Sequence, residues 1–212
     1  MLPDTWTRGE IESSFAECAT LSEVIARLER ERSVHGEVIC EIRVNGLLLR
    51  EEDEVRFADT ARSTIAELAI VTHRSTDLIC QALRSVAAFL PNLDASCIQT
   101  SDVIRDGGLI AAHKPFRDIV EGCQWAVETL IHARGAASGI GLPLAQAERW
   151  HDAEKTLSGT VRELVAAFEA KDGALVADIL EYEVPGASAI WVEAIGRELA
   201  VREQPDHDKC PV

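Results

Sequence analysis

A glutamate and a histidine three residues apart are the chain's nearest approach to a metal-binding motif. Glu148 and His151 form a Glu-x-x-His, which carboxylate-bridged di-iron bundles use twice, with two further glutamates, all pointing inward. A second copy is missing, because Glu128 and His132 are four residues apart. Trp150 lies on the expected apolar stripe of the same helix, which turns Glu148 and His151 toward its flanks. We therefore expect no metal site.

The patterns typical of nucleophilic catalysis and of phosphate binding are not found. The sequence lacks Gly-x-Ser-x-Gly, the turn that exposes a hydrolase serine. Gly139 and Gly141 lie between predicted helices, not after a strand, so they do not form a dinucleotide fingerprint. Cys80 and Cys123 have no evident basic neighbour to favour a thiolate, which indicates packed thiols. We expect no catalytic residue and no cofactor.

Glu183 has the most unusual predicted position. Pro185 follows it and cannot donate a hydrogen bond to the carbonyl of Glu181. A buried carboxylate must be paired, hydrogen-bonded or protonated. We expect Glu183, with its neighbour Tyr182, to be a structural polar pin; the alternatives are a ligand-binding acid, or a kink at Pro185 that turns Glu183 outward. The prediction rests on helical spacing after the N-cap Asp172, which puts Glu183 on one stripe with apolar residues: Val176, Ile179, Leu180, Ala187, Ile190, Trp191 and Ala194.

Trp125 is the strongest candidate for an interface. It projects away from the apolar stripe of its helix, on the side of Glu121, Glu128 and His132. A tryptophan rimmed by polar residues is typical of an interface anchor. The alternative is a central helix that is buried on two faces, with the N-terminal module covering Trp125.

The charge of the chain excludes some classes of partner. Lysine and arginine number 21 against 36 aspartates and glutamates, a net charge of −15. Such a surface argues against nucleic acid and against anionic membranes. We expect a protein partner or self-association.

The cysteines and the N-terminus favour the cytoplasm. None of the six cysteines forms a C-x-x-C pair, so a zinc or thioredoxin-type motif is not expected. The N-terminus has neither a basic region nor an apolar region like those of signal peptides. No apolar run approaches the roughly 20 residues that cross a bilayer. We expect free thiols in a reducing cytoplasm.

Residues 1–74 are predicted to form a small α+β module. Thr20 and Glu23 fit a capping box for a helix over residues 21–32. Alternation predicts strands over 37–44 and 65–72. A helix on a small sheet resembles the ubiquitin-like β-grasp, whose members serve mainly as interaction modules. We also expect a weak strand or two before residue 18, a turn at Asn45–Gly46, a return strand over 47–49 and a solvated turn at 51–54.

Residues 75–202 are predicted to form an antiparallel helical bundle. The hydrophobic period changes from 2 to 3.6 near residues 74–77, which indicates a domain boundary. A disordered tail is expected over 203–212. The predicted helices are 78–90, closed by Pro91; 94–105, broken at Gly107–Gly108; 115–132, begun by Pro115; 144–171, after a loop over 135–143; and one from Asp172.

The segment A-K-D-G-A-L-V-A-D-I-L-E-Y-E-V, followed by Pro185 and Trp191, resembles a segment of uncharacterised bacterial proteins that join a small sheet module to a helical bundle. No activity transfers from this resemblance. The fold class is therefore α+β, mostly helical. We expect a non-catalytic protein–protein interaction protein, an adaptor or chaperone-like module. The alternative is a small-molecule or metal-binding enzyme with its site in the bundle.

Overall fold

The computed structural model describes residues 3–142, 144 and 147–202. The chain is α+β and mostly helical, as predicted, and divides into two compact units, Met1–Leu78 and one that begins at Ile79. The predicted boundary at residues 74–77 lies close to this division. The predicted tail over 203–212 falls outside the described residues. Within the described residues, no helix is both long and apolar enough to cross a membrane.

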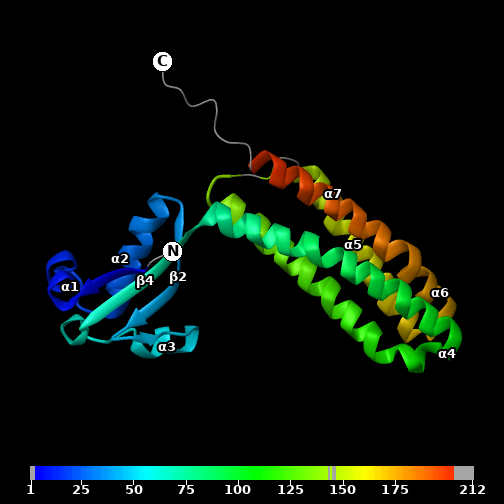
Figure 1. Ribbon diagram of the computed structural model, residues 1–212, viewed down its shortest axis with the longest axis horizontal. Helices are drawn as coiled ribbons and strands as arrows, with labels where there is room; N and C mark the ends of the chain where they lie inside the picture. The colour runs from blue at the N-terminus through cyan, green and yellow to red at the C-terminus, as the bar shows by residue number, and fades with distance from the viewer. Residues whose placement is uncertain (1–2, 143, 145–146, 203–212) are drawn as a thin grey trace, which may run out of the picture. The chain divides into compact units, whose positions relative to one another are not determined.

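The first unit holds a four-stranded sheet in which every pair of neighbours is antiparallel (Figure 1). Asn45 and Gly46 both have positive φ, 51° and 81°, which confirms the predicted two-residue turn. The amide oxygen of Asn45 also accepts hydrogen bonds from the backbone N–H groups of Ala66 and Glu67 at 2.7 and 3.0 Å. The strand order is β1 (Asp4–Thr7), β4 (Glu67–Arg74), β2 (Glu37–Val44), β3 (Leu47–Leu48).

Helix α2 (Leu21–Val34) packs on this sheet and buries Leu21, Val24 and Leu28 in its core. Its N-cap is Thr20, whose hydroxyl accepts the N–H of Glu23 at 3.4 Å, so the predicted cap is confirmed. Helix α1 (Arg8–Ser14) and the short 3₁₀ turn η1 (Arg62–Thr64) complete the module.

Two local predictions in this unit are wrong. The predicted solvated turn at 51–54 is the beginning of helix α3 (Glu51–Phe57). The alternation that predicts this strand also puts Val38 and Cys40 on one face with Ile42, but both are exposed whereas Ile42 is buried. The reason is a register shift between Ile39 and Glu41, typical of a β-bulge, which reverses the faces that residues on either side present.

The second unit begins with the long element α4 (Ser75–Gly139), whose first turn belongs to the first unit. Gly108, with φ 75° and ψ 175°, divides α4 into two helical segments, called here the first arm (75–107) and the second arm (109–139). The break predicted at Gly107–Gly108 is therefore confirmed. The predicted helix end at Pro91, the start at Pro115 and the loop over 135–139 are wrong, because both prolines lie inside the arms and the second arm continues to Gly139.

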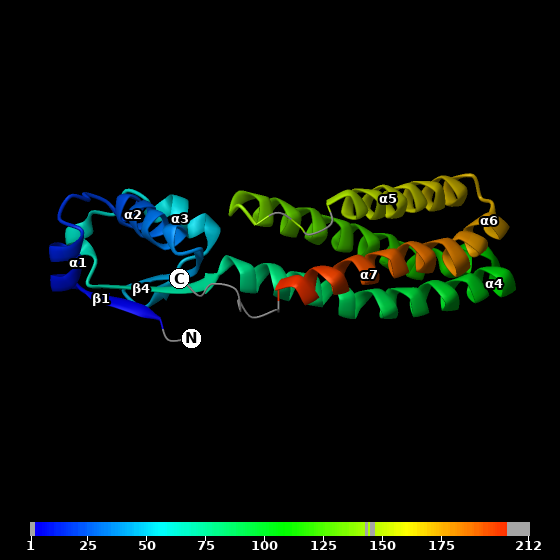
Figure 2. The ribbon, with the colours of Figure 1, turned by 90° about the horizontal axis from the view of Figure 1, so that it is seen from above.

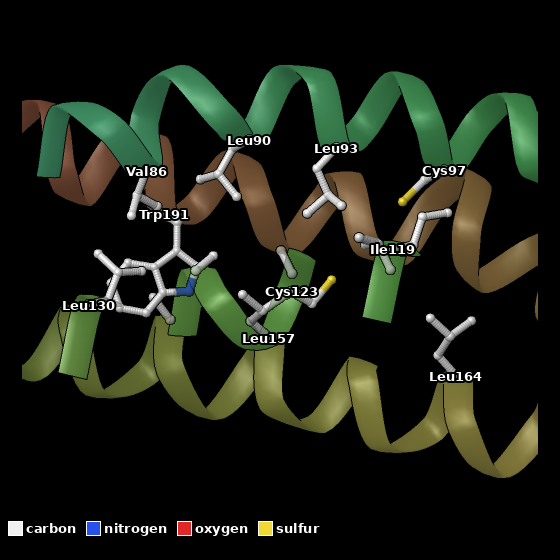
Figure 3. Close-up of a cluster of buried hydrophobic side chains, with 14 of the residues drawn as sticks. Val86, Leu90, Leu93, Cys97, Ile119, Cys123, Leu130, Leu157, Leu164 and Trp191 are labelled. Carbon is white, nitrogen blue, oxygen red and sulfur yellow. The ribbon is translucent and has the colours of Figure 1, made fainter. Parts of the chain in front are cut away.

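The bundle is completed by α5 (Ala147–Glu169) and a composite helix that returns along it (Figure 2). The composite helix consists of α6 (Gly173–Asp178), a π-helical segment η2 (Ile179–Glu183) and α7 (Val184–Arg202). Asp172 caps α6, as predicted, by accepting the N–H of Leu175 at 3.0 Å. The arms of α4, α5 and α7 enclose one apolar core that includes Leu90, Leu130, Leu157 and Trp191 (Figure 3).

Candidate functional site

The π-helical segment changes which residues of the last helix are buried. The N–H of Val184 bonds to the carbonyl of Ile179, five residues back, in place of Leu180. Pro185 cannot donate to Glu181, and its ring would crowd that carbonyl in an α-helix, so a wider turn forms. The extra residue advances the buried stripe by one position, and Val184 is fully buried while Glu183 is exposed.

The prediction that Glu183 is a buried polar pin is therefore wrong. Among the described residues it makes no hydrogen bond or ion pair. The buried acid of this helix is Glu198, 2% exposed, whose Oε1 lies 2.6 Å from Nε of Arg202. Glu198 continues the predicted stripe of Trp191 and Ala194 at ordinary helical spacing, so the sequence pattern could have identified it as an acid on the core face.

Tyr182, the other residue of the predicted pin, is 64% exposed and lies beside Glu181. A hydrogen bond from Tyr182 and an ion pair with Arg105 of the first arm lower the pKa of Glu181. The same carboxylate raises the pKa of Tyr182. Arg105 also lies 3.1 Å from Asp178. This surface cluster ties the composite helix to the first arm, and Glu181 and Arg105 are the members that sequence reasoning missed.

Trp125 is 43% exposed on the second arm. Its ring packs edge-on against Phe89 of the first arm, with ring centroids 4.9 Å apart and an interplanar angle of 73°. Gly122 allows this approach, because a Cβ at that position would lie 2.9 Å from Cζ of Phe89. The pair therefore marks a close contact of the two arms while leaving part of the indole in solvent.

An open groove of 370 Å³ lies between the two arms and has Phe89 in its wall. Its apolar lining includes Leu93, Val103 and Ile119. The polar side chains of Asn92 and Ser96 in the wall bond to carbonyls of their own helix, at 3.3 and 2.9 Å. We call this surface, with Trp125 beside Phe89, the arm groove; its lining residues are Phe89, Asn92, Leu93, Ser96, Gln99, Thr100, Val103, Pro115, Asp118 and Ile119.

The other predicted interface residues are also exposed on the second arm. Glu121 lies 3.5 Å from Arg117 in an ion pair. Glu128 lines a different, smaller groove of 220 Å³ between the second arm and α5. His132 lies one helical turn beyond Glu128. The structure thus brings Trp125 to the arm groove, with Glu121 on the same outer face, and places Glu128 at the neighbouring groove.

A polar contact between the half-buried Asp94 and the buried Ser188 joins the first arm to α7. Burial raises the pKa of Asp94, and the hydroxyl of Ser188, which faces it, partly offsets this effect. Among the described residues, Oδ1 of Asp94, Oγ of Ser188 and Nε1 of Trp191 are buried without a well-formed hydrogen bond. No sequence pattern indicated this contact, because Asp94 and Ser188 are far apart in the chain.

The cysteines that point into the bundle are packed thiols (Figure 3). Burial raises the pKa of the Cys97 thiol, and the neighbouring thiol of Cys123 raises it further. Burial, with a smaller contribution from the charge of Asp94, raises the pKa of the Cys123 thiol to about 12. Both groups are therefore poor nucleophiles near neutral pH. Cys80 is also buried, as predicted.

The two residues of the Glu-x-x-His pattern do not converge on a common metal site. Glu148 and His151 are both exposed on α5, whereas Trp150 between them is buried, as the sequence predicted. In the part of the chain that the structure describes, no group of three or more histidine, cysteine or acidic side chains could hold a metal ion.

Comparison with known proteins gives one family. A family model described as a domain of unknown function (DUF8042) matches residues 81–194, more than half of the chain. The match runs from the first arm of α4 into α7 and includes every residue of the arm groove. No curated protein matches the chain, and no solved structure matches it. The chain thus belongs to the DUF8042 family, through the helical bundle that forms the arm groove.

Proposed function

We propose that this chain is a non-catalytic protein-binding protein, an adaptor or chaperone-like module, and that the arm groove receives its partner. The observation that carries the proposal is the half-exposed Trp125, which packs on Phe89 of the groove wall. Partly exposed aromatic rings beside an apolar groove are typical of residues that dominate binding energy.

The chemistry of the groove supports binding rather than catalysis. Its wall is formed largely by apolar side chains and by polar groups already bonded within their own helix. Such a wall supplies contact area and shape. The titratable group in the wall is Asp118, which lies 3.8 Å from Arg117.

The reducing cytoplasm of a bacterium is the proposed location. The five cysteines within the described residues are free thiols, as expected where thioredoxin and glutathione keep cysteines reduced. The resemblance of the segment around Asp172 to bacterial proteins supports the same assignment.

The alternative function is small-molecule binding in the bundle. The observation that favours it is the contact of Asp94 with Ser188, because buried polar atoms without well-formed hydrogen bonds occur at ligand sites. A ligand held there would depend on Asp94 and not on Trp125.

Capture of partners by three forms of the full chain tests the proposal. The wild type, Trp125→Ala and the control Ile110→Ala serve as bait; Ile110 is 94% exposed at the start of the second arm, away from the arm groove. We expect wild type and Ile110→Ala to retain the same partner, and Trp125→Ala to lose about tenfold or more of it, as for an interface anchor. Equal retention by Trp125→Ala, with helix content unchanged, would contradict the proposal.

A further inference from the structure

An open pocket at one end of the bundle has no part in the proposed function. It has a volume of 730 Å³ and lies where α4 reverses and α5 leads into α6 (Figure 2). We call it the tip pocket; its lining comes from residues 107–113 and 168–173 and shares no residue with the arm groove. Its volume lies in the range of about 300–1,000 Å³ that is typical of small-molecule sites. The tip pocket is therefore a candidate ligand site that is independent of the protein partner.

The walls of the tip pocket are apolar and partly held in place by packing. Leu109 and Ile110 line it from the start of the second arm, and Phe168 lines it from the end of α5. Phe168 stacks on the buried Phe116, with ring centroids 3.9 Å apart and an interplanar angle of 17°. Because Phe116 does not line the pocket, a ligand would meet the rest of the Phe168 ring. Ile110 is almost fully exposed, so a ligand that covers it removes apolar surface from water.

The shape of the lining suits a ligand with flat rings. Gly107, Gly108 and Gly173 leave stretches of the wall as bare backbone. The imidazole of His113 also lines the pocket, and its centroid lies 6.0 Å from that of the Phe168 ring. Aromatic rings pack favourably on other rings when they are offset or meet edge to face.

The charges of the lining favour a neutral ligand. Beside His113, the lining has one acid and one base, Glu169 and Lys171, whose charges cancel. An anion would be opposed by Glu169, and a cation would be opposed by Lys171. The net charge of −15 on the whole chain disfavours anions further.

We propose that the tip pocket binds a neutral, apolar small molecule with an aromatic ring system. The rings of the ligand stack on Phe168, and its body covers Ile110. This site would be separate from the arm groove, so each can be tested without the other.

Two fluorescent probes with the same ring system test the site. N-phenyl-1-naphthylamine is neutral, and 8-anilinonaphthalene-1-sulfonate adds a sulfonate; the emission of both rises in apolar surroundings. Titration with the full chain measures the Kd of each probe. We expect the neutral probe to bind at least about tenfold more tightly than the sulfonate. Its Kd should change less than about twofold with salt, because no ion pair forms.

A matched pair of variants locates the neutral probe. Ile110→Ala should raise its Kd about fivefold or more, because the variant removes most of an apolar side chain from the wall. The control is Ile98→Ala, because Ile98 is also exposed on α4 but lies outside the pocket lining; its Kd should change less than about twofold. Circular dichroism of both variants checks that the helix content is unchanged.

Two further variants separate the charge assignment and the two sites. Lys171 has a φ of 58°, which glycine adopts without strain, so Lys171→Gly preserves the turn. This variant should leave the Kd of the neutral probe unchanged. Trp125→Ala should bind the probe as the wild type does, and Ile110→Ala should still capture the protein partner.

The remaining outcomes overturn the inference in distinguishable ways. If the sulfonate binds as tightly as the neutral probe and Lys171→Gly weakens it, the ligand is an anion and the proposed class is wrong. If neither probe binds, or if Ile110→Ala binds like the wild type, the tip pocket is not a ligand site. If Trp125→Ala loses the probe, the probe occupies the arm groove, and this inference fails while the proposed function stands.

Discussion

At the scale of single residues, the bundle accommodates two acidic side chains, Glu198 and Asp94, in different ways. Glu198 is buried and paired with Arg202, which is itself largely buried. Asp94 faces Ser188 and lacks a cationic partner among the interactions that shift its pKa. A buried carboxylate is tolerated when paired, and is a liability when it must stay charged without a partner. We therefore expect loss of the Arg202 partner to destabilise the bundle and neutralisation of Asp94 to stabilise it.

Removal of the Glu198 partner should destabilise the bundle. Arg202→Met should lower the free energy of unfolding by about 3 kcal/mol, because it removes a cation that is paired with a buried carboxylate. The control is Arg197→Met on the same helix, whose exposed pair with Glu193 has the same i, i+4 spacing and should contribute less than about 1 kcal/mol. Urea denaturation compares the two. Equal losses would show that the burial of Glu198 does not set the cost.

Asp94 should make stability depend on pH. Burial raises its pKa above the ordinary value of 3.8, so the folded chain holds this proton more tightly than the unfolded chain. The resulting stability is fully present below the unfolded pKa and is lost as pH rises through the folded pKa. Asp94→Asn cannot ionise, so its advantage in the free energy of unfolding over wild type should grow between about pH 4 and pH 7.

Urea denaturation of the wild type and of Asp94→Asn at a series of pH values measures this difference. A difference that stays constant over the interval would mean that the Asp94 carboxyl titrates alike in the folded and unfolded chains.

At the scale of elements, the arm groove exists because α4 reverses at Gly108. A φ of 75° at this residue is readily adopted only by glycine. The reversal sets the two arms side by side, and Gly122 lets Phe89 approach the second arm closely. The prolines inside the arms do not interrupt them: Pro91 is exposed on its helix, while its neighbours Leu90 and Leu93 are buried in the core. Burial of such apolar neighbours can outweigh the hydrogen bond that a proline removes.

Two glycines of α4 should therefore respond oppositely to alanine. Gly108→Ala should lower the free energy of unfolding by more than about 1 kcal/mol, because a Cβ is strained at positive φ. Gly135→Ala, in the second arm with no atom near the added Cβ, should raise it by about 0.5–1 kcal/mol. Thermal unfolding followed by circular dichroism measures both. Stabilisation by Gly108→Ala would show that the reversal does not need the left-handed conformation.

Sequence patterns predicted the features that depend on neighbouring residues. The Asn45–Gly46 turn, the caps at Thr20 and Asp172 and the break at Gly108 are local, and all are confirmed. The failures are positions where packing overrides a local preference, as at Pro91 and Pro115, or where one inserted residue changes the phase, as in η2 and at the β-bulge near Cys40. The arm groove and the Asp94–Ser188 contact join distant segments, and periodicity within one helix cannot reveal such pairs.

At the scale of the whole molecule, two separately packed cores share one chain. One core centres on Leu68 and Ile70 of β4, and the other on the helices of the bundle. The arm groove lies entirely within the second unit. Binding through the groove should therefore not require the sheet module, whose own role is then separate.

A fragment of residues 79–202 tests this independence. Because its core is complete without the first unit, the fragment should retain its helical circular dichroism and unfold in one cooperative transition. A fragment that loses helix content or unfolds without cooperativity would show that the two units stabilise each other.

The central claim is that a partner covers the arm groove, and oxidative side-chain footprinting of the full chain tests it most directly. Trp125 and Tyr182 are both exposed, 43% and 64%, and both are reactive aromatic residues at different places on the bundle. On addition of the captured partner, we predict that oxidation of Trp125 slows severalfold while that of Tyr182 is unchanged, because the bound chain excludes water from the anchor residue. Protection of Tyr182 with unchanged oxidation of Trp125 would contradict the claim and place binding at the cluster of Glu181 and Arg105.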